Sequence, residues 1–397
     1  MGDRQMRLSI GYTKEGKMEK ERVTVKEEDI RFRYLYGFAI LFVVLSHCDG
    51  GGMELLSNWM HFGAFHLAVF VFGSGYFFRA DQLRAPLIWL WHKVKCLLLP
   101  VWGWNLAYGM LIWLMHRMGF TFGEQLSIRN LLIFPIKSEN LYVLNMGSWF
   151  VFSLFMVQLL YGICKLILDR FCKSERAEII LQIAFLLVGF CGVYLARHGF
   201  HETRMYPAFR VLYFMPFYSF GVHYRTYLDK LMKKLSVETW LILCLMAALL
   251  LNTYFGRVVY TIPSSCDYPF GVIATYLSAV IGIVFWLKCS EWLAEANELC
   301  KPLLMLGRNT WNIMIHQFLG IMVVKTFFAI GYRFLHIFPD FDPQAYLSDI
   351  WYLYQPAGLH EYTFLYVMGA IAISVLIGMG SKYLAQRAKL FIQKMFP

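Results

Sequence analysis

Long apolar runs separated by short polar segments dominate the sequence. Ten such runs occur between residues 34 and 382. Each is close to the roughly 20 residues that a helix needs to cross a lipid bilayer. We therefore predict an all-α fold, a polytopic bundle of about ten transmembrane helices. The expected spans are 34–49, 60–78, 97–116, 148–168, 178–196, 206–224, 238–256, 268–288, 309–330 and 362–382.

Composition agrees with this pattern. Hydrophobic residues make up 58% of the 397 positions and charged residues only 16%, and the mean hydropathy is +0.50. A soluble protein would carry about 25% charged residues. The net charge of +11 would suit a nucleic-acid-binding protein, but the basic residues lie between the apolar runs rather than on one soluble module. The lipid bilayer is thus an expected partner, whereas nucleic acid is not.

The positions of lysine and arginine predict the orientation, because these residues accumulate in cytoplasmic segments. With the N-terminus inside, 28 of the 37 lysine and arginine residues fall on inner segments and nine on outer ones. We expect both termini in the cytoplasm, with 1–29 as a flexible tail, 30–385 as the membrane domain and 386–397 as a short basic tail. The polar residues 1–29 contain no apolar stretch of the kind found in a cleavable signal peptide.

Two connections differ from plain loops. Residues 85–100 mix tryptophan, histidine and lysine with aliphatic residues, which predicts an amphipathic segment at the inner membrane surface, with Pro100 at the start of the third span. Residues 331–361 form a long outer loop that carries three aspartates. Loops of this length are often functional.

Two isolated histidines carry the candidate chemistry. His47 stands near the end of the first apolar run, and His66 stands a few residues into the second. An ionisable side chain within a membrane span is costly and therefore suggests function. We expect both imidazoles in the outer half of the membrane, facing one cavity. There a neutral imidazole can take a proton from a hydroxyl and return it to a leaving group, which suits acyl transfer to a sugar alcohol. The alternative is that each histidine only bonds a neighbouring helix.

The nine cysteines are scattered and form no CxxC pair, so no metal site is predicted.

Five segments resemble, in order, the signature segments of the acyltransferase-3 family of integral membrane O-acyltransferases. The resemblance is closest to its fucose O-acetylase-like and exopolysaccharide-modifying members, and it covers most of residues 30–382. The segments are IRFRYLYGFAILFVVLSH (30–47), FHLAVFVFGSGYFF (65–78), the basic segment ending in LLLP (97–100), GSWFVFSLFMVQLLY (147–161) and GRNTWNIMIHQF (307–318).

The resemblance implies a membrane enzyme of about ten spans in the bacterial inner membrane. It implies acetyl-CoA, or another short acyl-CoA, as the donor from the cytoplasm. It also implies a hydroxyl of a cell-surface or lipid-linked glycan as the acceptor. The alternative is a transporter or flippase for a glycan or lipid, which would also carry isolated histidines and arginines at a cavity. Transporters usually show paired half-repeats with broken helices, and we find no such symmetry in the sequence.

The resemblance also implies roles for individual residues. His47 aligns with the family's essential first-helix histidine and is the expected base, and His66 aligns with a histidine before the SGY turn. Lys93 and Lys95 match a basic pair whose charge would hold the phosphates of CoA at the inner surface. The alternative for these lysines is ordinary anchoring on the cytoplasmic side.

The sequence departs from the family pattern at one position. The family usually has arginine or lysine eleven residues before the histidine, where this chain has Tyr36. We expect Arg33 to replace that cation in binding the donor, since residues i and i+3 share a helix face. Arg31 lies on another face and is expected to act only in topology. If Arg33 is not the replacement, Arg308 is the next candidate.

Two further residues are candidates for substrate binding. Trp149 opens the fourth span, either as part of an interfacial aromatic belt or as a stacking platform for a sugar ring. His316 lies in the middle of the ninth span, either as a helix-packing residue or in a supporting role at the site. A polar cluster in an outer loop is read either as solvated or as selecting the acceptor. Its members are His198, His201, Glu202 and Arg204.

Overall fold

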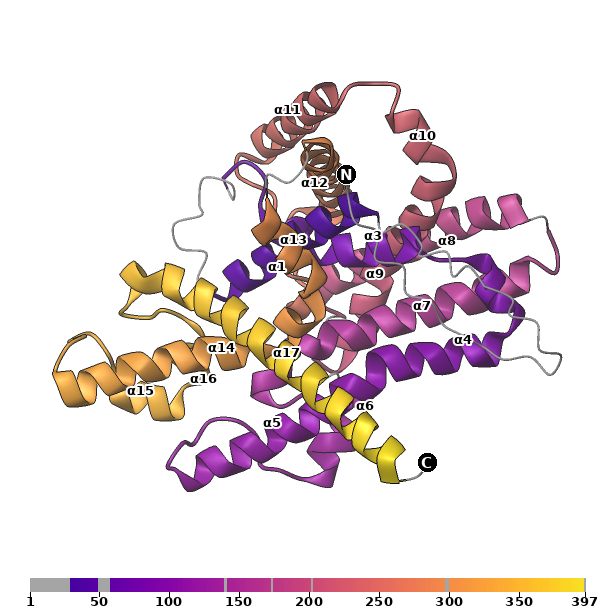
Figure 1. Cartoon of the computed structure of the whole chain (residues 1–397). Helices are drawn as coiled ribbons and strands as arrows, with labels where there is room; N and C mark the ends of the chain where they lie inside the picture. Colours follow the sequence, from indigo (N-terminus) through magenta and orange to yellow (C-terminus); the bar gives the residue numbers. More distant parts are fainter. Residues whose placement is uncertain are drawn as a thin grey trace, which may run out of the picture. The chain divides into compact units, whose positions relative to one another are not determined.

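The computed structural model describes residues 29–48, 58–138, 141–172, 174–200, 203–296 and 300–395. The chain divides into two units, residues 1–30 and residues 31–397. The second unit contains the helical bundle. The described residues of the bundle form helices and the connections between them, with no β-structure beyond an isolated bridge between Ile262 and Asp267. The predicted all-α fold is confirmed (Figure 1).

Each of the ten predicted spans overlaps a helix, with bounds that differ by up to 13 residues at one end. These helices are α1 (Ile30–His47), α3 (His66–Tyr76), α5 (Leu99–Arg117), α7 (Trp149–Leu168), α8 (Ser174–Leu195), α9 (Tyr206–His223), α11 (Val237–Phe255), α12 (Gly271–Glu295), α14 (Thr310–Ile330) and α17 (Thr363–Met395). Shorter helices lie between them: α4 (Pro86–Lys93), α6 (Phe134–Ser138), α10 (Asp229–Met232), α13 (Lys301–Arg308), α15 (Pro343–Ser348) and α16 (Ile350–Tyr354).

Within the described residues, eight helices are long and apolar enough to cross a membrane, as a multi-pass membrane protein requires. Two of the ten predicted spans fall outside this group. One is the apolar segment Phe62–Tyr76, made of a short 3₁₀ turn η1 (Phe62–Ala64) and α3, which is too short. The other is α9, whose 18 residues include Pro207, Pro216 and Arg210. The total of ten spans therefore stays a prediction.

Close backbone contact explains how the short helix α3 is accommodated. A Cβ atom at Gly75 of α3 would collide with the carbonyl of Tyr218 in α9, and one at Gly221 of α9 would collide with the carbonyl of Phe72 in α3. Small residues let membrane helices approach this closely. Helix α3 is therefore enclosed by its neighbours, and eight of its 11 residues are buried.

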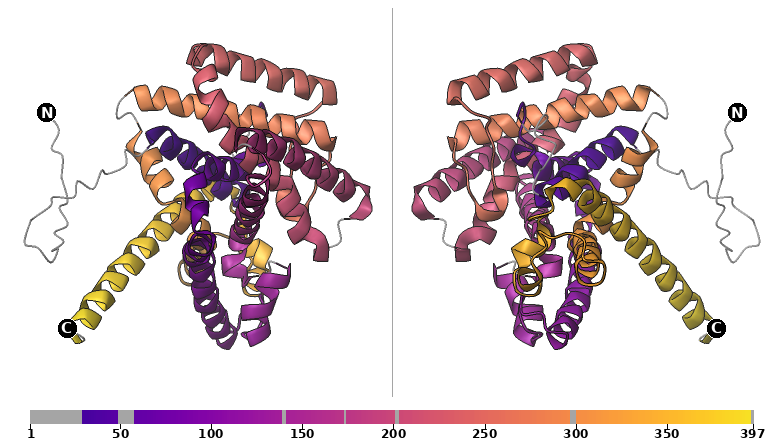
Figure 2. Two further views of the ribbon diagram at one scale, coloured as in Figure 1. Left: turned by 90° about the vertical axis from the view of Figure 1, so that its right-hand side faces the viewer. Right: turned by 90° about the vertical axis from the view of Figure 1, so that its left-hand side faces the viewer.

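Helix α11 shows the opposite character. It lies beside α12 in both views of Figure 2, and its large apolar side chains are mostly exposed, including Leu243, Met246 and Leu250. Only two of its 19 residues are buried. An apolar surface of this extent is unfavourable in water. It fits the acyl chains of a bilayer, as expected for a membrane partner.

The segment expected to lie at the inner surface is continuous with the third span. Helix α4 passes through a π-helical turn, η3 (Val94–Leu98), into α5, so that Pro86–Arg117 forms one apolar helical stretch. The π turn closes with the N–H of Leu99 donating to the carbonyl of Val94. It ends just before Pro100, which has no N–H to donate. π-Helical structure occurs mostly as single turns of this kind within longer helices, and it is one of the identifiable causes of a bend.

The long connection 331–361 is partly helical. Asp342 and Asp349 are the N-cap residues of α15 and α16, and their carboxylates accept backbone N–H groups of the first turns. Two of the loop's three aspartates thus serve as helix caps.

Helix α17 continues through most of the segment expected as a separate tail, 386–397, and ends at Met395. Its side chains from 382 to 391 are exposed, and this end extends away from the other helices (Figure 2).

Candidate functional site

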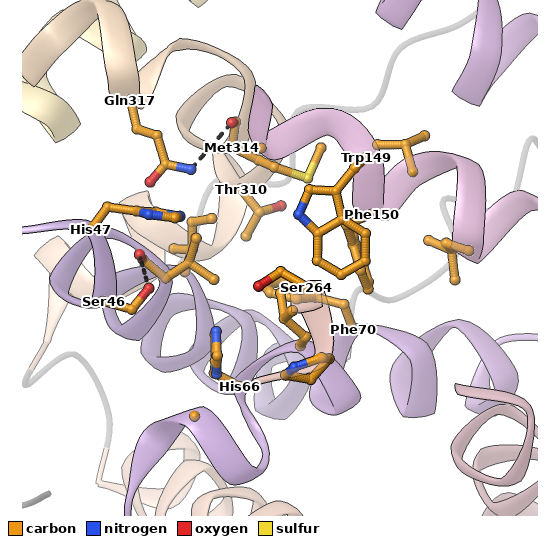
Figure 3. Close-up of a pocket in the computed structure, with 18 of the residues that line it drawn as sticks. Ser46, His47, His66, Phe70, Trp149, Phe150, Ser264, Thr310, Met314 and Gln317 are labelled. Atoms are coloured by element: carbon orange, nitrogen blue, oxygen red, sulfur yellow. Dashed lines mark hydrogen bonds between the residues drawn. The ribbon is translucent and has the colours of Figure 1, made fainter. Parts of the chain in front are cut away.

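One cavity of about 770 Å³ lies among α1, α3, α7 and α14 and is completed by residues 61–63, Leu97, Gly147, residues 261–264 and Gln355. Figure 3 shows residues that line it. On α1 the lining residues are Tyr36, Ile40, Val43, Ser46 and His47. Their spacing of three and four places them on one helix face, so the cavity follows α1 for about 16 Å at 1.5 Å per residue.

Helices α1, α3 and α7 each contribute one polar or aromatic residue to one end of the cavity and another to the opposite end. At one end, which we call the histidine end, lie His47 of α1, His66 of α3 and Trp149 of α7. At the other, which we call the glutamine end, lie Tyr36, Ser74 and Gln158 of the same three helices. His66 and Ser74 are eight residues apart on α3, about 12 Å along its axis. The cavity is therefore elongated, with chemically different ends.

The prediction that His47 and His66 face one cavity is confirmed. His47, the last residue of α1, packs edge-on against Phe318 with ring centroids 4.7 Å apart. His66 lies within electrostatic reach of His47. In Figure 3 the two imidazoles point into the same space, opposite Trp149.

The backbone fixes the tautomer of His66. Its Nδ1 lies 2.7 Å from the carbonyl oxygen of Phe62. Because a carbonyl oxygen only accepts, Nδ1 carries the proton, and the neutral ring keeps its lone pair on Nε2. The bond to Phe62 at the start of α3 thus leaves Nε2 of His66 as a proton acceptor.

Sequence reasoning missed a third imidazole, His61. It also lines the cavity, and its Nδ1 accepts the backbone N–H of Gly63 at 3.0 Å. This bond leaves the proton of the neutral ring on Nε2, the tautomer opposite to that of His66. The signal was present as two histidines five residues apart at the start of a short apolar helix.

No lysine, arginine, aspartate or glutamate is among the described residues that line the cavity. An unpaired charge in such surroundings would be costly, so the part of a ligand that enters is expected to be uncharged. Leu97 of η3 lines the cavity, but the two lysines before it, Lys93 and Lys95, do not; Lys93 is half-buried and Lys95 is exposed.

Arg33 also lies outside the lining. Its Nη1 donates to the carbonyl of Gly307 at 3.4 Å, where α1 meets α13. The two backbones are in close contact here, since there is no room for a Cβ at Gly307: it would collide with the carbonyl of Arg33. Tyr36, at the position where the family usually has a cation, does line the cavity. The arrangement therefore does not bring Arg33 to the place that the sequence suggested for it.

Arg31 has a larger structural role than expected. Its Nη1 contacts the carboxylates of Asp229 at 3.0 Å and Glu291 at 3.1 Å, and its Nη2 donates to the hydroxyl of Tyr76 at 3.0 Å. Glu291 also pairs with the Nζ of Lys288 at 2.6 Å. We call Arg31, Asp229, Lys288 and Glu291 the ion cluster. The expectation that Arg31 acts only in topology was wrong, because it joins α1 to α3, α10 and α12.

Trp149 lines the cavity and is braced by a cation that sequence reasoning did not select. The guanidinium of Arg210, from α9, lies 4.3 Å from the centre of the Trp149 ring. Its Nε donates to the carbonyl of Ser264 at 3.1 Å, and Ser264 also lines the cavity. Arg210 therefore positions two walls of the site. The sequence signal that could have identified Arg210 is its position as an arginine within an apolar run.

His316 is buried beside the cavity rather than on it. Its Nδ1 lies 2.6 Å from the hydroxyl of Tyr108, and its ring packs edge-on against Trp104 at 4.3 Å. Its helix neighbours Met314 and Gln317 line the cavity. The geometry places His316 in the contact of α14 with α5, through Tyr108 and Trp104.

Lys325 is fully buried in α14 and was not selected from the sequence. Its ammonium donates to the carbonyl oxygens of Gln355 at 3.0 Å and Ala357 at 3.5 Å. It also lies 3.7 Å from the ring centre of Tyr352. Because Gln355 lines the cavity, Lys325 anchors one wall of the site to the bundle.

Two remaining expectations concern other parts of the chain. His198 is exposed and bonds the carbonyl of Tyr194 one turn earlier, while His201 and Glu202 of the same cluster lie outside the described residues. Within the part of the chain that the structure describes, no three histidine, cysteine, aspartate or glutamate residues are grouped to hold a metal ion.

Comparison with known proteins found no matching family model, no matching curated protein and no matching solved structure. The resemblance to the acyltransferase-3 family therefore rests on the five sequence segments described above.

Proposed function

We propose that the chain is a membrane O-acyltransferase that moves an acetyl or other short acyl group from acyl-CoA to a hydroxyl of a cell-surface or lipid-linked glycan. The observation that carries the proposal is the histidine end of the cavity. There His66 offers a lone pair and His61 offers an N–H, each fixed by the backbone, beside His47.

The chemistry of acyl transfer matches these groups. An imidazole of the His47 and His66 pair takes the proton of the acceptor hydroxyl while its oxygen attacks the thioester carbonyl. The tetrahedral intermediate carries a negative oxygen, which the N–H of His61 is suited to stabilise. Collapse breaks the carbon–sulfur bond, and the departing thiolate takes the proton back from the imidazolium. The products are the ester and free CoA.

Because the described lining residues include no cation, the charged phosphates and the uncharged pantetheine arm of the donor are expected to bind in different places. The phosphates of CoA remain outside the cavity, where the basic segment with Lys93 and Lys95 offers compensating charge. The uncharged pantetheine arm enters and carries the thioester to the imidazoles. Trp149 provides a flat wall for a sugar ring at the same end.

Acyl transfer is tested with the purified full-length protein in lipid nanodiscs, labelled acetyl-CoA and a cell-surface polysaccharide extract. We expect release of CoA and label in the polysaccharide. His47→Ala and His66→Ala should each lower the rate about 100- to 10,000-fold, the range for loss of a general base. The control is His198→Ala, which removes an exposed imidazole outside the cavity and should leave the rate unchanged.

The competing assignment is a transporter or flippase for a glycan or lipid. It predicts no CoA release, but movement of a labelled lipid-linked sugar across vesicles that contain the protein. Movement without CoA release, or normal CoA release by well-folded His47→Ala and His66→Ala variants, would refute the proposed mechanism.

A further inference from the structure

We propose that the glutamine end of the cavity is a second binding subsite, in which Gln158 and Ser74 hold a neutral amide or hydroxyl group of the ligand. The proposal rests on the proposed function and adds to it the chemistry recognised at the end opposite the imidazoles.

The first observation is an unpaired carbonyl. Gln158 of α7 is only 3% exposed, and its Nε2 donates to the hydroxyl oxygen of Ser74 at 2.8 Å. Its Oε1 has no hydrogen-bond partner among the described residues, although the side chain lines the cavity. Leaving a buried acceptor unpaired is costly, so the site favours a ligand that brings an N–H or O–H.

The second observation is that Ser74 completes a matched pair. Its oxygen accepts the Gln158 amide, so its own hydroxyl proton remains to be donated. The subsite therefore presents one acceptor and one donor side by side. An amide and a hydroxyl each carry both functions and would fit, whereas a carboxylate or phosphate would face the Gln158 oxygen with no proton to give.

The walls around this pair are aromatic and uncharged. Tyr36 stacks on Phe70 with ring centroids 5.6 Å apart, and both residues line the cavity. These walls favour a ligand segment with apolar surface between its polar groups. Such a segment must also be extended, because Ser74 lies about 12 Å along α3 from His66.

The histidine end carries a similar group. Gln317 of α14 is fully buried and lines the cavity, its Nε2 donates to the carbonyl of Met314 at 3.3 Å, and its Oε1 has no partner among the described residues. In Figure 3 its amide lies beside His47. An extended ligand with donor groups near both of its ends would satisfy both glutamines.

Two sources supply this chemistry. One is the pantetheine arm of the acyl-CoA donor, which carries two amides in an uncharged chain. The other is a second sugar residue of the glycan acceptor, which carries hydroxyls. They are distinguished by truncating the donor, because S-acetylpantetheine keeps both amides whereas S-acetyl-N-acetylcysteamine keeps only the amide nearer the thioester.

The experiment measures KM for acetyl-CoA, for both truncated donors and for the polysaccharide extract, using Gln158→Leu and Ser74→Ala protein in nanodiscs. For a donor-arm subsite we expect KM for acetyl-CoA and S-acetylpantetheine to rise about tenfold in Gln158→Leu. KM for S-acetyl-N-acetylcysteamine should stay unchanged. For an acceptor subsite, KM for the polysaccharide should rise and the donor constants should stay unchanged.

The control is Gln82→Leu, which makes the same substitution at an exposed position. Unchanged KM values for every donor and for the acceptor in both well-folded variants would overturn the subsite while leaving the proposed function standing. If Gln158→Leu fails to fold, Ser74→Ala and the shorter amide in Gln158→Asn carry the test. Wild-type protein that neither releases CoA nor acylates the extract would overturn the proposed function, and the subsite with it.

Discussion

The cavity and the ion cluster are both polar regions inside an apolar bundle, but their polar groups are arranged in opposite ways. In the ion cluster the two cations and two carboxylates pair with one another across α1, α10 and α12. In the cavity the described lining residues carry no lysine, arginine, aspartate or glutamate, and the amide oxygens of Gln158 and Gln317 have no partner in the part of the chain that the structure describes.

This difference separates groups that hold the helices together from groups that are available to a ligand. A buried charge is tolerated when a partner of opposite charge lies next to it, and removing one partner leaves the other uncompensated. Each cavity carbonyl that lacks a partner among the described residues costs about 1–3 kcal/mol, and a ligand that brings an N–H or O–H would remove that cost. Substitutions in the ion cluster should therefore affect folding, and those in the cavity should affect activity.

The largest effect on stability is expected from Glu291→Leu. Glu291 is buried and contacts both Arg31 and Lys288, so its loss leaves two cations without this carboxylate. Breaking such a buried arrangement costs about 3 kcal/mol or more. We expect thermal unfolding of the protein in nanodiscs at a clearly lower temperature. Acyl transfer per folded molecule should remain normal, because Glu291 does not line the cavity.

The matched control is the exposed pair Arg79 and Asp81, whose side chains are 50% and 59% exposed. Asp81→Ala should leave the unfolding temperature within error, since exposed ion pairs contribute little. Equal unfolding temperatures for Glu291→Leu and wild type would show that the ion cluster does not stabilise the bundle.

A smaller and more local effect is expected from Lys325→Met. Methionine keeps an unbranched apolar chain but removes the ammonium, so the carbonyls of Gln355 and Ala357 lose their donor. A hydrogen bond from a charged donor contributes about 1.5–3 kcal/mol, and water can partly replace it at the exposed Gln355. We expect faster amide hydrogen exchange between residues 349 and 359, with exchange in α3 and α7 unchanged. Unchanged exchange in this segment would mean that Lys325 does not anchor it.

The helices were predictable because each apolar run carries its own signal. The two isolated histidines were predictable for the same reason, since nothing in the runs around His47 and His66 explains an imidazole. The partners of a polar side chain were not predictable. Arg31 and Arg33 stand two residues apart in the first turn of α1, yet Arg31 meets acids 198 and 260 residues away whereas Arg33 meets a backbone carbonyl.

A comparison of Gln158 with Gln182 also shows that the partners of a polar side chain could not be predicted from the sequence. In sequence, Gln158 and Gln182 are each a single amide within a long apolar run. In the fold, the Oε1 of Gln182 accepts the hydroxyl of Ser219 at 2.8 Å, whereas the Oε1 of Gln158, at the cavity, has no partner within the described ranges. Whether a polar group is satisfied depends on residues from other helices, so local patterns do not distinguish a packing residue from a binding residue.

The smallest effect is expected from Arg210→Lys, which tests how firmly the histidine end of the cavity is shaped. Lysine keeps the positive charge but lacks the planar guanidinium that lies over Trp149 and bonds the carbonyl of Ser264. A cation–π contact of this kind is worth about 1 kcal/mol, or about fivefold in a binding constant. We expect KM for the polysaccharide acceptor to rise about fivefold and KM for acetyl-CoA to change little.

Arg257→Lys is the matched control, because Arg257 lies 4.7 Å from the ring centre of Phe270, and neither residue lines the cavity. If Arg210→Lys and Arg257→Lys both leave the acceptor constant unchanged, Trp149 keeps its place without the guanidinium. If the donor constant rises instead, the flat wall at the histidine end binds the acyl donor and the acceptor must occupy another part of the cavity.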